Sequence, residues 1–132
     1  MRFKEIFVFG LVGTLGFLVD SGILYLLKEH WGVYLARLAS FACAVFVTWV
    51  CNRRITFGSR HSGKSLPREF AEYLAYMLLG GACNYGIYSA LVASSAVAHE
   101  YPILGVAAGS LAGMFINFFS AKFFLFRNAK AM

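Results

Sequence analysis

The sequence predicts an all-α integral membrane protein whose four transmembrane helices form two parallel helical-hairpin repeats. Three observations support this fold class: the hydrophobic composition, four apolar runs of membrane-spanning length, and a pattern of small residues that occurs twice. Of the 132 residues, 60% are hydrophobic and only 14% are charged, whereas soluble domains average about 25% charged residues. We therefore expect a single membrane domain over residues 1–132.

Four apolar runs are long enough to cross a bilayer. A helix needs about 20 residues to span the ~30 Å hydrocarbon layer, and in lipid it satisfies its own backbone hydrogen bonds. The first run is too long for the apolar region of a signal peptide and no small-residue cleavage pattern follows it, so we expect it to stay as a span. The four runs are Ile6–Leu27, Val33–Cys51, Phe70–Val92 and Pro102–Phe124.

The second run carries a small or polar residue at every fourth position, which draws one stripe along a helix. In membranes such stripes are helix contacts, because small side chains let two backbones approach closely. The fourth run begins at Pro102, which suits the first turn of a helix because its missing N–H costs nothing there. The stripe of the second run consists of Ala36, Ser40, Ala44, Thr48 and Asn52.

The second half of the chain repeats the first. A shift of 69 positions (105 − 36) places the first four residues of the second run's stripe on Gly105, Gly109, Gly113 and Asn117 of the fourth. A shift of 64 positions (80 − 16) relates the first run to the third, pairing Gly16 with Gly80 and Asp20 with Asn84. We expect repeats at about 5–57 and about 70–127, related by an axis along the membrane normal as in some transporters.

The basic residues predict the orientation. Of the 12 Lys and Arg residues, all but Lys28 and Arg37 fall on one side of the predicted spans. By the positive-inside rule, both termini and the basic loop 58–69 are cytoplasmic, and the loops 28–32 and 93–101 face outward. The residues on the cytoplasmic side are Arg2, Lys4, Arg53, Arg54, Arg60, Lys64, Arg68, Lys122, Arg127 and Lys130.

Two charged residues lie inside the predicted spans. Asp20 is seven residues from the outer end of the first run (27 − 20), roughly 10 Å deep, and Arg37 is four residues from the outer end of the second (37 − 33), roughly 6 Å deep. Each charge alone costs on the order of 2.5–3.5 kcal/mol at a helix centre and less toward the interface. We interpret them either as a structural ion pair or as part of a polar path for a substrate.

Asn52, Arg53 and Arg54 end the second run at the predicted cytoplasmic surface, where the phosphate of a lipid headgroup would arrive. Arginine suits this ligand, because its planar guanidinium can bind two phosphate oxygens at once. The repeat places Lys122 at the position that matches Arg53 (122 − 53 = 69). We therefore count these four residues as candidate substrate contacts.

The second repeat offers neutral polar side chains inside the membrane. Asn84 matches Asp20 of the first repeat, so a substrate path would be charged on one side only. Asn117 and Thr48 lie deeper toward the inner leaflet and are predicted to form hydrogen bonds between helices. Asn84 and Asn117 complete the candidate substrate contacts.

The sequence carries no motif of a common enzyme class. It has no nucleotide-binding loop, catalytic triad or metalloprotease motif, and its three cysteines have neither CxxC spacing nor a nearby histidine cluster. We expect a protein that is not an enzyme, has no cofactor or metal, and has membrane lipid rather than nucleic acid as its partner.

From Phe7 to Arg127 the chain resembles the GtrA-like family of small four-helix bacterial membrane proteins. The resemblance lies in FGLVGTLGFLVDSGILYLL and in ARLASFACAVFVTWVCNRRITF, with its Asn-Arg-Arg-x-x-Phe ending. In the second repeat Ala121 and Lys122 stand where family members often keep Asn-Arg. The resemblance implies translocation (flipping) of a polyprenyl-phosphate-linked sugar across the bacterial inner membrane for cell-surface polysaccharide synthesis, beside a glycosyltransferase that makes the donor.

Two other functions are compatible with the residues. The protein could be an accessory or scaffold subunit of a membrane glycosyltransferase, with purely structural charges. It could also be a small proton-coupled cation exporter that uses Asp20, although a fixed cation at Arg37 would repel cationic substrates. Four helices enclose little volume, so we also expect a homodimer that uses the small-residue stripes.

Overall fold

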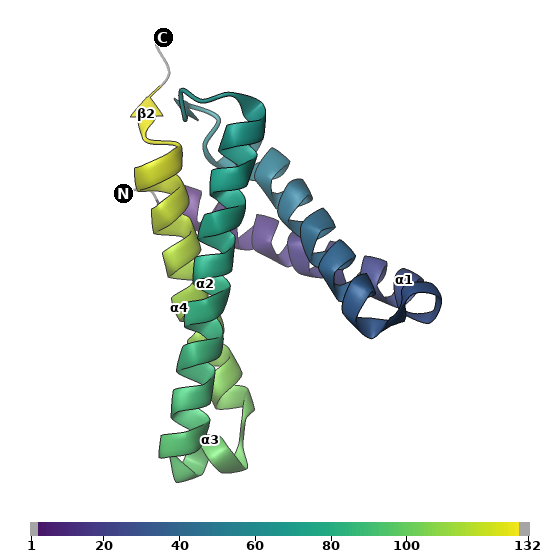
Figure 1. Ribbon diagram of the computed structural model, residues 1–132. Helices are drawn as coiled ribbons and strands as arrows, with labels where there is room; N and C mark the ends of the chain where they lie inside the picture. Colours follow the sequence, from purple (N-terminus) through teal and green to yellow (C-terminus); the bar gives the residue numbers. More distant parts are fainter. Residues whose placement is uncertain (1–2, 130–132) are drawn as a thin grey trace. The chain divides into compact units, whose positions relative to one another are not determined.

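The computed structural model describes residues 3–129, whose regular structure is almost entirely helical (Figure 1). These residues divide into two compact units, 3–64 with 128–129 and 65–127. Within the described residues, three helical segments are long and apolar enough to cross a membrane: Phe3–Gly32, Tyr34–Thr56 and Ile103–Leu125. The prediction of an all-α membrane protein is therefore confirmed.

Helix α1 (Phe3–Cys51) consists of two arms that meet at Gly32. Gly32 has φ 79° and ψ 163°, a conformation that is essentially restricted to glycine. The arms fold back on each other, because Gly16 of the first arm lies against Thr48 of the second. The outer loop predicted at 28–32 is therefore helical except at Gly32, which alone makes the turn.

The second arm continues past Cys51 as a π-helical turn, η1 (Asn52–Thr56). The N–H of Phe57 donates to the carbonyl oxygen of Asn52 at 2.8 Å, the five-residue spacing of a π-helix. Phe57 is fully buried and packs on Phe9 of the first arm, with 6.2 Å between the ring centroids. The wide turn thus lies where the ends of the two arms pack together.

A two-stranded antiparallel sheet completes the first unit. Strand β1 (Arg60–His61) pairs with strand β2 (Asn128–Ala129). Arg60 also forms an ion pair with Glu5 of α1, in which Nε and Oε2 lie 3.6 Å apart. The loop predicted at 58–69 is therefore only partly irregular, because backbone pairing orders the part that forms β1.

The second unit is a helical hairpin. Helix α2 (Leu66–Ser94) and helix α4 (Ile103–Ser120) lie side by side (Figure 1). The short helix α3 (Ala96–Glu100) occupies part of the loop predicted at 93–101. Helix α4 runs on into a second π-helical turn, η2 (Ala121–Leu125).

The small residues of α4 form its contact with α2. The contacts follow an antiparallel order: Gly105 with Tyr88, Gly109 with Asn84, and Gly113 with Gly80. A Cβ atom added at any of these three glycines of α4 would lie within 3.0 Å of an atom of α2. The predicted use of the stripe as a helix contact is therefore confirmed, and it is made within the hairpin.

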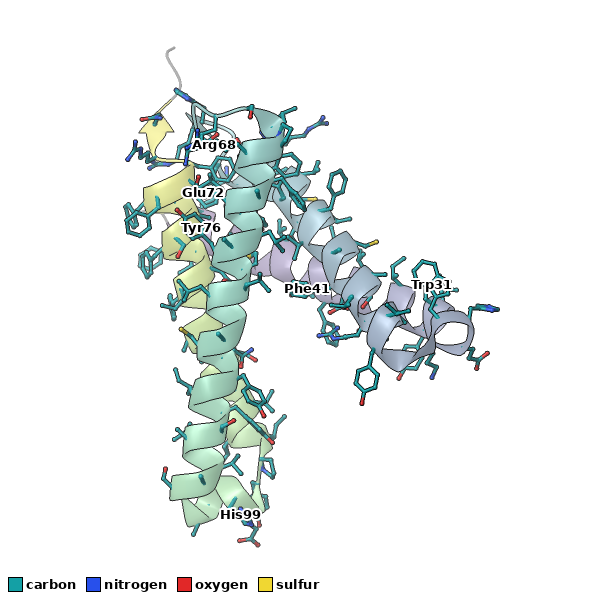
Figure 2. All side chains as sticks on the ribbon, in the orientation of Figure 1. Trp31, Phe41, Arg68, Glu72, Tyr76 and His99 are labelled. Atoms are coloured by element: carbon teal, nitrogen blue, oxygen red, sulfur yellow. The ribbon has the colours of Figure 1, made fainter. Side chains whose placement is uncertain are left out.

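Large apolar side chains remain exposed along the helices, as expected where lipid surrounds them. In the first unit Phe7, Leu26 and Leu38 are 67%, 69% and 69% exposed. Trp31 lies at the turn of the first hairpin and His99 lies on α3 (Figure 2). Aromatic rings near helix ends are typical of the level of the lipid headgroups.

Candidate functional site

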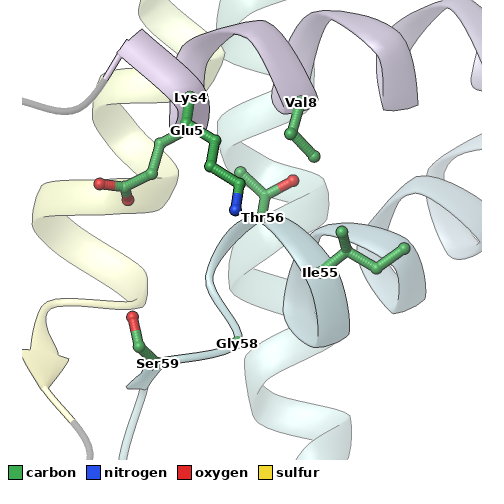
Figure 3. Close-up of a pocket in the computed structure, with 7 residues that line it drawn as sticks. All are labelled: Lys4, Glu5, Val8, Ile55, Thr56, Gly58 and Ser59. Atoms are coloured by element: carbon green, nitrogen blue, oxygen red, sulfur yellow. The ribbon is translucent and has the colours of Figure 1, made fainter.

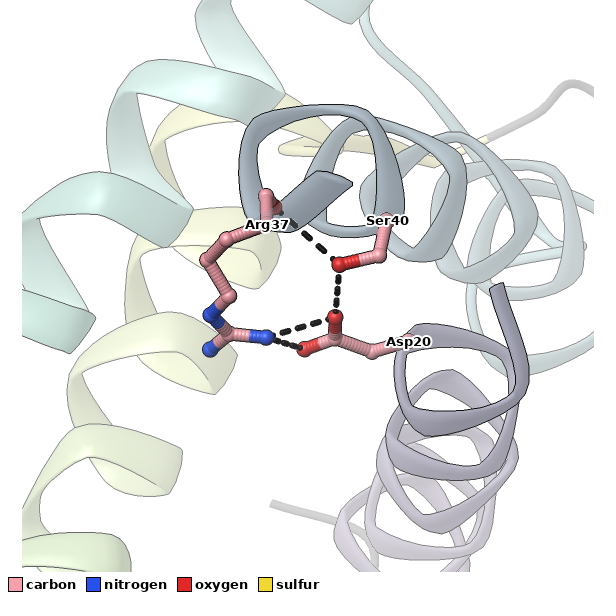
Figure 4. A network of polar contacts seen from close by, with 3 residues as sticks. All are labelled: Asp20, Arg37 and Ser40. Carbon is pink, nitrogen blue, oxygen red and sulfur yellow. Dashed lines mark hydrogen bonds and ion pairs between the residues drawn. The ribbon is translucent and has the colours of Figure 1, made fainter. Parts of the chain in front are cut away.

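An ion pair joins the two arms of α1 (Figure 4). Nη1 of Arg37 lies 2.6 Å from Oδ1 and 2.5 Å from Oδ2 of Asp20, so one nitrogen binds both carboxylate oxygens. The hydroxyl of Ser40 donates to Oδ1 of Asp20 at 2.6 Å and lies 3.1 Å from the carbonyl oxygen of Arg37. Arg37 and Ser40 share a helix face because they are three residues apart. Asp20 and Arg37 therefore form the ion pair that one of the two interpretations predicts, with Ser40 as a third member.

The guanidinium of Arg37 uses only part of its hydrogen-bonding capacity in this network. Within residues 3–129, its Nε and Nη2 make no hydrogen bond. The side chain of Arg37 is 55% exposed, compared with 16% for Asp20. Nε and Nη2 form the planar fork that binds a carboxylate or a phosphate through two parallel hydrogen bonds. Asp20 and Ser40 thus hold a guanidinium in place while its fork stays open to a further anion.

Asn52, Arg53 and Arg54 lie together in η1, at the other end of the second arm from Arg37. Asn52 is 1% exposed, and its Oδ1 accepts the hydroxyl of Thr56 at 2.7 Å. Its side chain therefore supports η1 from inside and does not point outward to the headgroup contact that the sequence predicts. Arg53 is half-buried and Arg54 is exposed, so these two arginines are the cations of η1 that can reach a phosphate.

The two asparagines of the second unit lie at the contact between α2 and α4. Asn84 lies against Gly109, and Asn117 lies against Gly80, where a Cβ would overlap its amide group. Oδ1 of Asn117 is buried, and no group within residues 3–129 donates a hydrogen bond to it. The predicted hydrogen bond between helices is therefore not made by this oxygen, which packs on a glycine.

Lys122 lies in η2 and is only 3% exposed. Its Nζ lies 5.7 Å from the ring centroid of Phe118 and 5.6 Å from that of Phe123. Aromatic rings attract cations at such distances, and more strongly when water is excluded. Lys122 is thus enclosed, and the predicted phosphate contact at this position is not accessible in the structure.

A family model described as GtrA/DPMS, transmembrane domain, matches residues 8–126. The chain belongs to this family. No curated protein matches the sequence. The match contains α1 from Val8 onward, both π-helical turns and α4, so it covers both units.

In this GtrA/DPMS domain, sequence reasoning missed Ser40 as a member of the charged network. Ser40 is fully buried, and its only signal was its position three residues after Arg37, on the same helix face. Within the described residues, no group of three His, Cys, Asp or Glu side chains could hold a metal ion. The chemistry that the site offers is the binding of anions by oriented guanidinium groups.

Proposed function

We propose that this protein translocates a polyprenyl-phosphate-linked sugar across the bacterial inner membrane for cell-surface polysaccharide synthesis. Membership of the GtrA/DPMS family supports the membrane setting and the class of substrate. The observation that carries the proposal is the Arg37 guanidinium, which Asp20 and Ser40 hold on the surface of an apolar hairpin with its fork open. Such a group fits the phosphate of a lipid whose prenyl chain stays in the bilayer.

A lipid carrier needs phosphate contacts at two levels. Arg53 and Arg54 of η1 provide cations at one end of the second arm, and Arg37 provides one near the other end. In our proposal the phosphate is first attracted to Arg53 and Arg54 from the cytoplasmic side and is met again at Arg37 in the outer half of the membrane. The polar groups of the second unit contribute no charge to this path, since Asn84 is neutral and Lys122 is enclosed.

We also propose that the two units are parallel repeats with four spans. The π-helical turns η1 and η2 are 69 residues apart (121 − 52), and so are the fully buried Phe57 and Phe126 (126 − 57). The contact of Gly16 with Thr48 recurs as that of Gly80 with Asn117. Helix α2, with 29 residues, is about 43 Å long and lies antiparallel to the apolar α4, which supports α2 as the fourth span.

Two kinds of reporter can be fused to each end of the chain: one that is active only in the cytoplasm and one that is active only outside it. We expect activity from the cytoplasmic kind alone at both ends. The physical reason is the excess of Lys and Arg on one side of the spans, which favours that side as cytoplasmic. A three-span chain would place the two reporters on opposite sides. Reporters that are active on opposite sides would therefore contradict both the orientation and the repeat, and external reporters that are active at both ends would contradict the orientation.

Purified protein in vesicles is expected to move a labelled polyprenyl-phosphate sugar between leaflets, measured by loss of label to an impermeant glycosidase. Replacing both Arg53 and Arg54 by Ala should slow this movement by about tenfold, the effect of losing one charge-assisted hydrogen bond. The matched control is Arg68→Ala, because Arg68 is exposed on the same predicted side and lies outside η1. Equal rates in protein-free vesicles would contradict the proposed function.

A second candidate is an accessory subunit that holds a membrane glycosyltransferase. The network of Asp20, Arg37 and Ser40 favours this candidate, because the same contacts would be expected if these residues only held two helices together. The same pairing counts against a cation exporter, since the Asp20 carboxylate is already bound by a cation. Translocation by the purified protein alone would exclude the accessory function.

A homodimer stays part of the proposal, but on the ground of size alone. The stripes that we expected at a dimer contact are used inside each hairpin, where Ala36 and Ser40 are fully buried and Gly109 packs on Asn84. The small volume that four helices enclose is the remaining argument for a second copy. Crosslinking should therefore be attempted at open positions such as Gly13 and Gly81, where a side chain would meet nothing within 4 Å.

A further inference from the structure

The first unit contains a pocket of about 260 Å³ that none of the residues discussed so far as substrate contacts lines. It lies where the first turns of α1 meet η1 and the residues that follow η1 (Figure 3). In the proposed topology this end of the unit is at the cytoplasmic surface. The pocket is lined by Lys4, Glu5, Val8, Ile55, Thr56, Gly58 and Ser59.

The two charged groups of this pocket point in different directions. Lys4 extends toward Thr56, whereas the carboxylate of Glu5 extends to the side of the view on which Ser59 lies (Figure 3). The charge of Glu5 is partly balanced by Arg60, 3.6 Å away. The apolar wall is provided by Val8 of α1 and by Ile55, which is 65% exposed. The pocket thus has a cationic part, a carboxylate and hydroxyl part, and an apolar edge.

We propose that this pocket binds the sugar-phosphate head of the transported lipid, with the phosphate at Lys4 and the sugar hydroxyls at Glu5 and Ser59. The inference rests on the proposed function and names the residues that recognise the head. An ammonium attracts a phosphate and a carboxylate repels it, which fixes the order of the two groups. A carboxylate has about four acceptor sites, so Glu5 can accept a sugar hydroxyl in addition to the contacts it makes within the unit, of which the ion pair with Arg60 is one. The first prenyl carbons leave over the apolar edge.

Equilibrium binding to the full chain in detergent micelles tests this assignment with three probes. These are a polyprenyl-monophosphate hexose, the same polyprenyl monophosphate without sugar, and free hexose 1-phosphate. We expect the glycosylated lipid to bind most tightly, and the free sugar phosphate at least about tenfold more weakly because it lacks the apolar contact. If the free sugar phosphate bound more tightly than the glycosylated lipid, the proposal that the pocket binds the lipid would be overturned.

Two substitutions separate the two parts of the pocket. Lys4→Gln is expected to lower the affinity for both lipids by about tenfold, because it removes the cation that contacts the phosphate. Glu5→Gln is expected to bind the lipid phosphate without sugar at least as tightly as the wild type does. The glycosylated lipid should no longer bind more tightly than the lipid without sugar. Ser59→Ala should reduce the difference in affinity between the two lipids while leaving the ion pair of Glu5 with Arg60 intact. If Glu5→Gln and Ser59→Ala lowered the affinity for both lipids equally, the assignment of the sugar to Glu5 and Ser59 would be overturned.

Val8→Trp tests the pocket without changing any charge. Val8 lies in α1 and lines the pocket, so the larger indole should fill it. It should abolish binding of the glycosylated lipid while far-UV circular dichroism stays that of the wild type. Arg68→Gln, which removes an exposed cation outside the pocket, should leave all three affinities unchanged. If wild type translocates the lipid and Val8→Trp does so at the same rate, the pocket assignment fails and the function stands. If wild type neither binds nor translocates it, the proposed function fails.

Discussion

Replacing Arg37 by Ala is expected to reduce translocation of the labelled lipid by roughly 10- to 100-fold. The open fork of the guanidinium is the phosphate contact in the outer half of the membrane, and a hydrogen bond to a charged group is worth about 1.5–3 kcal/mol. Arg37→Lys should restore the charge and the pairing with Asp20 but not the fork, so its rate should stay below that of the wild type. The measurement is the initial rate in vesicles that contain equal amounts of folded protein.

The exchanged variant Asp20→Arg with Arg37→Asp separates binding from structure. It restores an ion pair between the two arms of α1, so it should fold, as measured by circular dichroism and gel filtration in detergent. It moves the guanidinium to the first arm and away from Ser40, which is three residues from Arg37, so we expect no recovery of translocation. Full recovery would show that the pair serves only to hold the arms together.

Replacing Gly109 by Ala is expected to destabilise the second unit by about 2 kcal/mol, within the 1–3 kcal/mol range of overpacked cores. A Cβ there would overlap the backbone carbonyl oxygen of Asn84 and would lie 2.5 Å from its Oδ1. A backbone atom of α2 cannot move without shifting the helix, so α2 and α4 would have to separate. The higher helix propensity of Ala, about 1 kcal/mol, offsets only part of this cost. Thermal unfolding in detergent, followed by circular dichroism, measures the change.

Gly81→Ala is the matched control for Gly109→Ala. Gly81 lies in α2, and a Cβ added there meets nothing within 4 Å. The substitution should therefore be neutral or raise the thermal midpoint slightly through helix propensity. If both variants lost the same stability, the loss would come from a general effect of the methyl group, and the close contact of α4 with α2 would be contradicted.

The sequence predicted the helices well because a membrane limits the choices. Long apolar runs must be helical in lipid, and the small-residue stripe indicated which face packs. It could not show that the helical turns at η1 and η2 are π-helical, because a π-helical turn differs from an α-helix by one shifted backbone hydrogen bond. It also missed the pairing of β1 with β2, since two short segments far apart in the chain carry no periodic signal.

For the candidate site, the charged residues were visible in the sequence but their roles were not. Composition and depth alone indicated that Asp20 and Arg37 could pair, because a lone charge in a membrane is costly. Residue type did not show that Asn52 and Lys122 are enclosed, at 1% and 3% exposure, since a polar residue at a helix end can point either way. Burial depends on which neighbours the fold brings around the side chain.

By itself, the sequence determined that this protein is an all-α membrane protein of the GtrA/DPMS family, with its charges at a few defined levels. Hydrophobicity and spacing are properties of single helices, so they can be read from the chain alone. Only the tertiary structure decided that one nitrogen of Arg37 binds Asp20 while the fork stays open, and that Lys4 and Glu5 line a pocket with η1. Both depend on the packing of the two arms of α1, which bring distant residues within hydrogen-bond reach.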